Sequence, residues 1–158
     1  MNVLEQQGFG VLKETMALRN QLMDVLTDED LKFTLPKNPP LGELCRDSGE
    51  LEQMYIDGFK TFKMEWRYRY QDPDIAFSVE RLKAWYAELD AALLNTLAVL
   101  SDDDIANRPI VRGGGFAPPV RVQFHIYRES LLIFGGKVSC YLFTLDKHVS
   151  EQWDHWIG

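Results

Sequence analysis

The sequence has few of the residues that build disulfide frameworks or histidine-rich metal sites. Its 158 residues include only two cysteines, Cys45 and Cys140, and three histidines. The cysteines are far apart and form no CxxC motif, so we expect both to be reduced residues of the core. No apolar run is long enough to cross a bilayer, and the first residues lack the basic and apolar blocks of a signal peptide. These absences predict a cytoplasmic protein.

An excess of basic residues is also absent. The formal net charge is -7, whereas contacts with nucleic-acid phosphates or anionic lipids require a basic surface. We therefore expect neither nucleic acid nor a membrane as a partner. Hydrophobic residues make up 46% of the chain and charged residues 26%, which is typical of a globular protein. The length suits one domain over residues 1–158.

Apolar residues recur at intervals of three and four along most of the chain, which predicts helices. No segment shows a convincing strand pattern. Ser78 is a plausible N-cap, and Pro40 suits the first turn of a helix. The expected helices are Leu4–Leu26, Leu41–Trp66, Val79–Leu100, a fourth that follows Pro119 and ends near Leu145, and a short tail helix from Ser150 to Trp156.

Four long amphipathic helices in one domain must bury their apolar stripes against one another. The predicted fold class is therefore all-α, a four-helix bundle with a short C-terminal tail helix. The irregular segment from Ser101 to Pro119 is long enough to cross one end of the bundle, so the order of the helices stays open.

Charged residues beside the apolar stripe of the second predicted helix form the first candidate site. Asp47 is next to the stripe residue Ser48, so its carboxylate could point toward the bundle interior. Arg46 and Glu50 are four residues apart and can form an ion pair on the flank. Asp47 is either a ligand or acid/base group, or a surface carboxylate paired with a nearby basic side chain.

His125 and Glu129 form the second candidate site, because residues four apart meet on one helix face. With Asp47 from a facing helix they would supply one nitrogen and two oxygen ligands. That set suits zinc, nickel, manganese or iron with open positions for water or substrate. The alternative is a structural polar network that includes Arg128.

Two segments together resemble a known family. The run Leu41-Gly42-Glu43-Leu44-Cys45-Arg46-Asp47-Ser48-Gly49-Glu50, with its continuation Tyr55-Ile56-Asp57-Gly58-Phe59, resembles the second-helix motif of the DinB-like (DinB/YfiT) superfamily. The run from His125 to Leu142 resembles the last long helix of that family. The resemblance implies a four-helix bundle, often a homodimer. It also implies a divalent metal held by three histidines, one on the second helix and two, four apart, on the last.

The resemblance allows two alignments of the last helix. In one, the three ligand positions fall on Asp47, His125 and Glu129, so that one histidine of three remains. In the other, Gly135-Gly136-Lys137 matches the Arg-Gly-Gln triplet that follows the last histidine in the family. The ligand positions on the last helix then become Ser130 and Phe134, and the metal site is lost.

The resemblance leads to two expectations for function. The first is a degenerate or variant metal-site bundle, without an assigned activity, that binds a small ligand or a partner such as a second copy of the chain. The second is a divalent-metal-dependent hydrolase, or a thiol-dependent transferase, that uses Asp47, His125 and Glu129 as ligands. No catalytic residue is assigned in either case.

Overall fold

The computed structural model describes all 158 residues, and its regular secondary structure is helical. Isolated bridges are its only β-type pairing. The prediction of an all-α fold is confirmed. The elements are α1 (Val3–Gln7), α2 (Phe9–Val25), α3 (Asp28–Leu31), α4 (Leu41–Thr61), the 3-10 helix η1 (Pro73–Phe77), α5 (Val79–Ala98), α6 (Asp102–Asn107), α7 (Val120–Thr144) and α8 (Glu151–Trp156).

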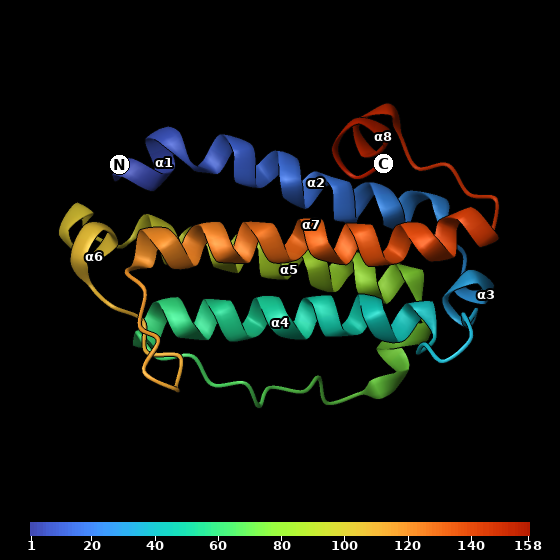
Figure 1. Cartoon of the computed structure of the whole chain (residues 1–158), viewed down its shortest axis with the longest axis horizontal. Helices are drawn as coiled ribbons and strands as arrows, with labels where there is room; N and C mark the ends of the chain where they lie inside the picture. Colours follow the sequence, from blue (N-terminus) through green and yellow to red (C-terminus); the bar gives the residue numbers. More distant parts are fainter.

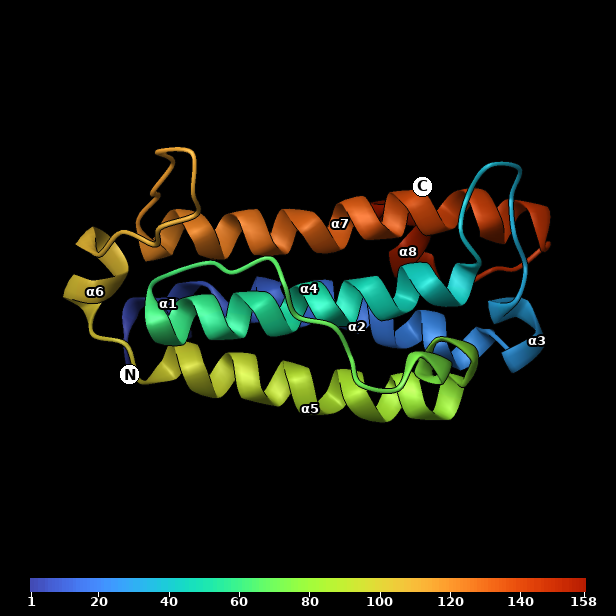
Figure 2. The same cartoon turned by 90° about the horizontal axis from the view of Figure 1, so that it is seen from below.

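Four long helices, α2, α4, α5 and α7, lie side by side along the longest axis (Figures 1 and 2). Both α2 and α4 pack against α5 and against α7. A continuous apolar core fills the space between these helices. The short helices α6 and α3 lie at opposite ends, and α8 packs on the outside near the C-terminus. No helix combines the length and the apolar character needed to span a membrane.

Local chemistry explains most of the helix ends. The Ser78 hydroxyl accepts a hydrogen bond from the Arg81 N–H at 3.4 Å and caps α5, as its sequence position predicted. The second predicted helix was too long, because α4 ends where Phe62 adopts a left-handed conformation with φ of 58°. The first predicted helix is interrupted at Gly8, so it forms α1 and α2.

Two glycines of the family-like motif are explained by packing. A Cβ atom at Gly42 would lie 1.7 Å from the carbonyl oxygen of Ala76, because η1 crosses α4 there with no space for a side chain. A Cβ atom at Gly49 would lie 2.4 Å from the Trp85 ring of α5. The chain therefore needs glycine at these positions for close contact between elements, independently of any ligand.

The two cysteines differ in environment. Cys45 is buried in the core, as predicted, whereas Cys140 is exposed. The prediction for Cys140 was wrong because α7 buries only part of its circumference, although it is apolar on more than one face. The tail helix α8 is held by Trp153, which is buried and donates a hydrogen bond from its indole Nε1 to Ser139 Oγ at 3.3 Å.

Candidate functional site

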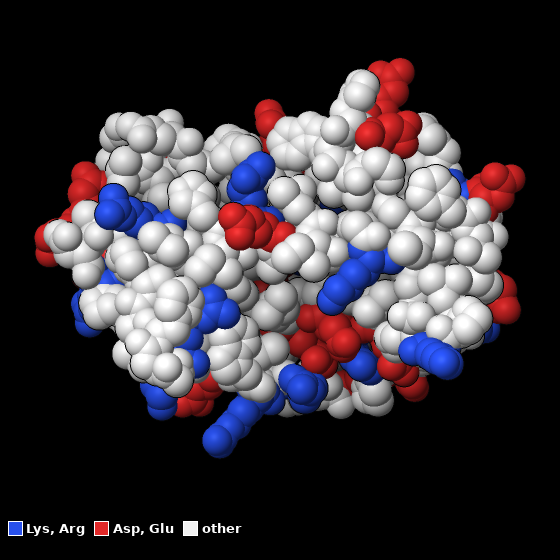
Figure 3. Space-filling view, viewed as in Figure 1, with Lys and Arg blue, Asp and Glu red and all other residues white.

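Asp47 lies in a shallow groove between α4 and α7. The groove encloses a cavity of about 200 Å³, and α4 supplies one wall and α7 the other. Acidic and basic side chains gather along the line where these two helices meet (Figure 3). The residues that line the groove are Leu44, Asp47, Ser48 and Leu51 from α4, and Ser130, Ile133, Phe134 and Lys137 from α7.

The groove presents opposite charges on opposite walls. The Asp47 side chain is 57% exposed and lies 3.2 Å from an Arg46 nitrogen, in an ion pair that solvent screens. Lys137 is exposed and has no carboxylate within ion-pair distance. Ser130 donates its hydroxyl hydrogen to the carbonyl oxygen of Tyr127 at 2.6 Å, so no base activates it as a nucleophile.

The predicted polar network exists in part. Arg46 Nε lies 3.6 Å from Glu50 Oε1, as the four-residue spacing predicted. Glu50 also accepts a hydrogen bond from the Tyr70 N–H at 3.0 Å, so it anchors the connection that follows α4. Arg128 lies elsewhere, because it faces α2 and its Nε donates to Thr15 Oγ1 at 3.2 Å.

His125 and Glu129 lie on an exposed part of α7. His125 lines a different cavity from Asp47, one formed with α1 and α6 at the end of the molecule. No group of three or more His, Cys, Asp or Glu side chains is placed to hold a metal ion. The structure therefore does not bring Asp47, His125 and Glu129 together, and metal binding by them stays a prediction.

The residues of the alternative alignment do come together. Asp47, Ser130 and Phe134 line the same groove, which is the arrangement expected if Gly135-Gly136-Lys137 takes the place of the family triplet. One carboxylate, one hydroxyl and one phenyl ring are not a donor set for a transition metal, which is held by imidazole, thiolate or several carboxylates. In this alignment the residues present do not fit a metal.

Three charged residues that sequence reasoning did not single out form a cluster in the core. Arg19 of α2 lies with its Nη1 2.6 Å from Glu52 Oε2 of α4, and with its Nη2 2.7 Å from Asp90 Oδ1 of α5. The Arg19 side chain is 1% exposed and that of Glu52 is 0% exposed. The guanidinium also stacks on the Tyr86 ring at 4.0 Å. The cluster therefore connects three of the four long helices.

The fourth long helix contributes Tyr127, whose hydroxyl is buried beside Glu52. Burial raises the pKa of Glu52 to about 7, although Arg19 and Tyr127 act in the opposite direction. Burial also raises the pKa of Tyr127, which keeps its hydroxyl protonated. Neither the Glu52 oxygens nor the Tyr127 hydroxyl makes a well-aligned hydrogen bond, so the cluster is only partly satisfied.

The cluster lies one helical turn from the groove. Ser48, a groove residue that is only 8% exposed, and Glu52 are four residues apart on the inward face of α4. Tyr127 precedes the groove residue Ser130 by three positions on α7. The signal for this cluster in the sequence was the position of Arg19 among the apolar residues Met16 and Leu22 of a helix stripe.

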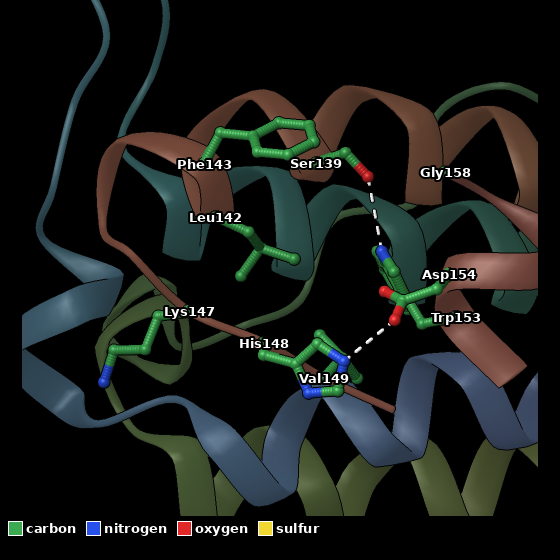
Figure 4. Close-up of a pocket in the computed structure, with 9 residues that line it drawn as sticks. All are labelled: Ser139, Leu142, Phe143, Lys147, His148, Val149, Trp153, Asp154 and Gly158. Carbon is green, nitrogen blue, oxygen red and sulfur yellow. Dashed lines mark hydrogen bonds and ion pairs between the residues drawn. The ribbon is translucent and has the colours of Figure 1, made fainter. Parts of the chain in front are cut away.

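A second cavity, of about 230 Å³, lies between α7 and the tail (Figure 4). Leu142, Phe143, Val149 and Trp153 supply its apolar wall. At its rim His148 Nε2 lies 2.9 Å from Asp154 Oδ2. These two side chains are 68% and 54% exposed, so the pair is a surface contact and contributes little to stability.

No family model matches this chain, and no curated protein matches it.

Proposed function

We propose that this protein is a DinB-like four-helix bundle that binds a small molecule in the groove between α4 and α7, where relatives would hold a metal. The proposed ligand has one positively charged and one negatively charged group. The packing of α2 and α4 against both α5 and α7 supports the bundle. The observation that supports the ligand is the pair of opposite charges, Asp47 and Lys137, on facing walls of a groove with apolar sides.

The groove determines the chemistry of the ligand. Lys137 would bind a carboxylate group, and Asp47 an amine or other cation, since a charged partner strengthens a hydrogen bond. Leu44, Leu51 and Ile133 would cover an apolar part of the ligand. A cavity of about 200 Å³ is smaller than the sites that hold drug-sized molecules, so an amino acid or a similar zwitterion suits it.

The experiment is a thermal-shift screen with free amino acids, betaines and short amino-terminated carboxylic acids, followed by calorimetric titration of the compounds that raise Tm. A ligand at a concentration of about 100 Kd stabilises the folded state by about 2.7 kcal/mol. We expect Lys137→Met and Asp47→Asn each to weaken binding by about tenfold, since each removes one charged contact. Lys13→Met is the matched control, because Lys13 is exposed on α2 outside the groove.

Two results would overturn this proposal. The first is a screen in which no zwitterion raises Tm. The second is a compound that binds Lys137→Met and Asp47→Asn as tightly as it binds the unmodified chain. If added zinc or nickel raised Tm and Asp47→Asn removed the rise, the metal-dependent alternative would replace it.

A further inference from the structure

Basic residues are concentrated in two connections of this acidic chain. Residues 60–70 and 108–121 contain seven of the 17 lysines and arginines but only one of the 24 acidic residues. The rest of the chain then has ten basic and 23 acidic residues. Residues 60–70 end α4 and form the connection after it, and residues 108–121 precede and begin α7. The charge distribution is therefore strongly asymmetric.

The two connections lie against each other in the folded chain (Figure 1). The Met64 N–H donates to the Val111 carbonyl oxygen at 2.8 Å, and the Val111 N–H donates to the Phe62 carbonyl oxygen at 3.0 Å. The Trp66 indole is 3.5 Å from the Arg112 carbonyl oxygen. Basic side chains accordingly gather around this end of the molecule (Figure 3).

Exposed aromatic rings lie among these basic residues. Trp66 is 40% exposed and Phe116 is 54% exposed. The Arg112 guanidinium lies over both rings, 4.9 Å from the centre of Trp66 and 5.6 Å from that of Phe116. Gln123 accepts a hydrogen bond from Arg112 Nη1 at 3.3 Å and holds this side chain in place. We call the surface formed by Trp66, Arg67, Arg112 and Phe116 the basic-aromatic surface.

The basic-aromatic surface has charged side chains without a carboxylate partner, and a backbone segment outside the backbone–backbone hydrogen bonds. Arg67 and Arg112 have no carboxylate within ion-pair distance, whereas Lys63 pairs with Glu65 at 2.7 Å. Residues 65–69 make no backbone–backbone hydrogen bond. Tryptophan and arginine are enriched among the residues that contribute most to protein–protein binding. The surface is thus suited to a protein partner.

We infer that the basic-aromatic surface binds an acidic segment of another protein, in which Asp or Glu residues alternate with apolar ones. The acidic side chains would pair with Arg67 and Arg112, and the apolar ones would cover Trp66 and Phe116. A short segment contacts only this surface, whereas a long polyanion such as nucleic acid would also meet the acidic remainder of the molecule. This inference is independent of the ligand proposed for the groove.

The test measures the anisotropy of fluorescein-labelled peptides in which Asp and Glu alternate with Leu or Phe. We expect binding that weakens as salt is added, because charge pairs between exposed groups are screened. Arg67→Gln and Arg112→Gln should each lower the affinity by about tenfold. Lys13→Gln makes the same charge change on α2, away from this surface, and should leave the affinity unchanged. Arg67 is exposed and supports no core contact, so Arg67→Gln should stay folded. The inference can therefore still be tested with Arg67→Gln if Arg112→Gln does not fold.

Three outcomes would overturn the inference. One is that no acidic peptide of the set binds. Another is that Lys13→Gln weakens binding as much as Arg67→Gln does, which would indicate a general charge effect. The third is that a labelled single-stranded oligonucleotide of the same length binds more tightly than every acidic peptide, which would identify the surface as a nucleic-acid site.

Discussion

Replacing Arg19 by methionine tests the buried charge cluster most directly. Arg19 is the only basic side chain within ion-pair distance of Glu52, and the side chains of both are at most 1% exposed. The substitution keeps an unbranched chain in the core but leaves a buried carboxylate without a cation. Removal of one partner from a buried ion pair costs about 3–5 kcal/mol. Since the stability of a whole domain is about 5–15 kcal/mol, this variant should be close to unfolding.

The loss should depend on pH, because the Glu52 carboxyl can become neutral. In the wild-type chain burial raises the pKa of Glu52 to about 7 against the lowering effect of Arg19, so loss of Arg19 raises this pKa further and the group holds its proton in mildly acidic solution. The variant then buries a neutral acid and loses less stability. As pH rises, Glu52 of the wild-type chain becomes charged beside Arg19, whereas in the variant a charged carboxylate would have no cation beside it, so the loss of stability increases.

The assay is urea unfolding followed by far-ultraviolet circular dichroism at about pH 5.5 and about pH 8. Arg128→Met is the matched control, because Arg128 makes one hydrogen bond to Thr15 and faces no carboxylate within ion-pair distance. It should cost about 1 kcal/mol at both pH values. Adding Glu52→Gln to Arg19→Met should recover part of the loss, since the two residues interact directly. A loss in Arg19→Met that equals the control, or that is the same at both pH values, would refute the reasoning.

Two further predictions concern the wild-type chain and its glycines. Between about pH 4.5 and about 7 the folded state holds the Glu52 proton and the unfolded state releases it, so the free energy of unfolding should fall by about 3 kcal/mol as pH rises through this window. Glu52→Gln should remove that part of the pH dependence of the urea midpoint, and an unchanged curve would contradict the assignment. Gly42→Ala should cost about 1–3 kcal/mol or prevent folding, because the new Cβ would meet the Ala76 carbonyl. Gly136→Ala, which meets nothing within 4 Å, should instead add up to about 1 kcal/mol, and equal Tm changes in the two variants would argue against the packing account.

The helical periodicity of the sequence predicted the four long helices because each buries one continuous face. Ser78 and Pro119 marked the starts of α5 and α7, since their chemistry acts within one turn. The end of α4 was not predictable, because the apolar and aromatic residues after Phe62 continue the pattern while the backbone turns away. The short helices α3 and α6 depend on capping boxes at Thr27 and Ser101, which span only three residues and give no periodicity.

The candidate site was harder to predict because it depends on the rotation of each helix about its axis. Leu44 and Leu51 of α4 lie toward the groove, whereas the charged residue Glu52 faces the core. The rotation of α4 that turns Glu52 inward cannot be predicted from the spacing of apolar residues, because a charged residue takes a core position. Sequence spacing alone also could not place His125 and Asp47 in different cavities, since that requires the relative register of α4 and α7.

The tail helix α8 covers part of the surface of α7. Helix α8 has six residues, too few to be stable alone, so its docking depends on the buried Trp153 and on contacts such as that between Gln152 and Gln21 at 2.8 Å. Release of this segment would require far less free energy than global unfolding, because the core between the four long helices would stay intact. The side of α7 that contains Gly135 and Ser139 would then face water. Undocking of the tail would thus expose this side of α7 while the four long helices stay packed.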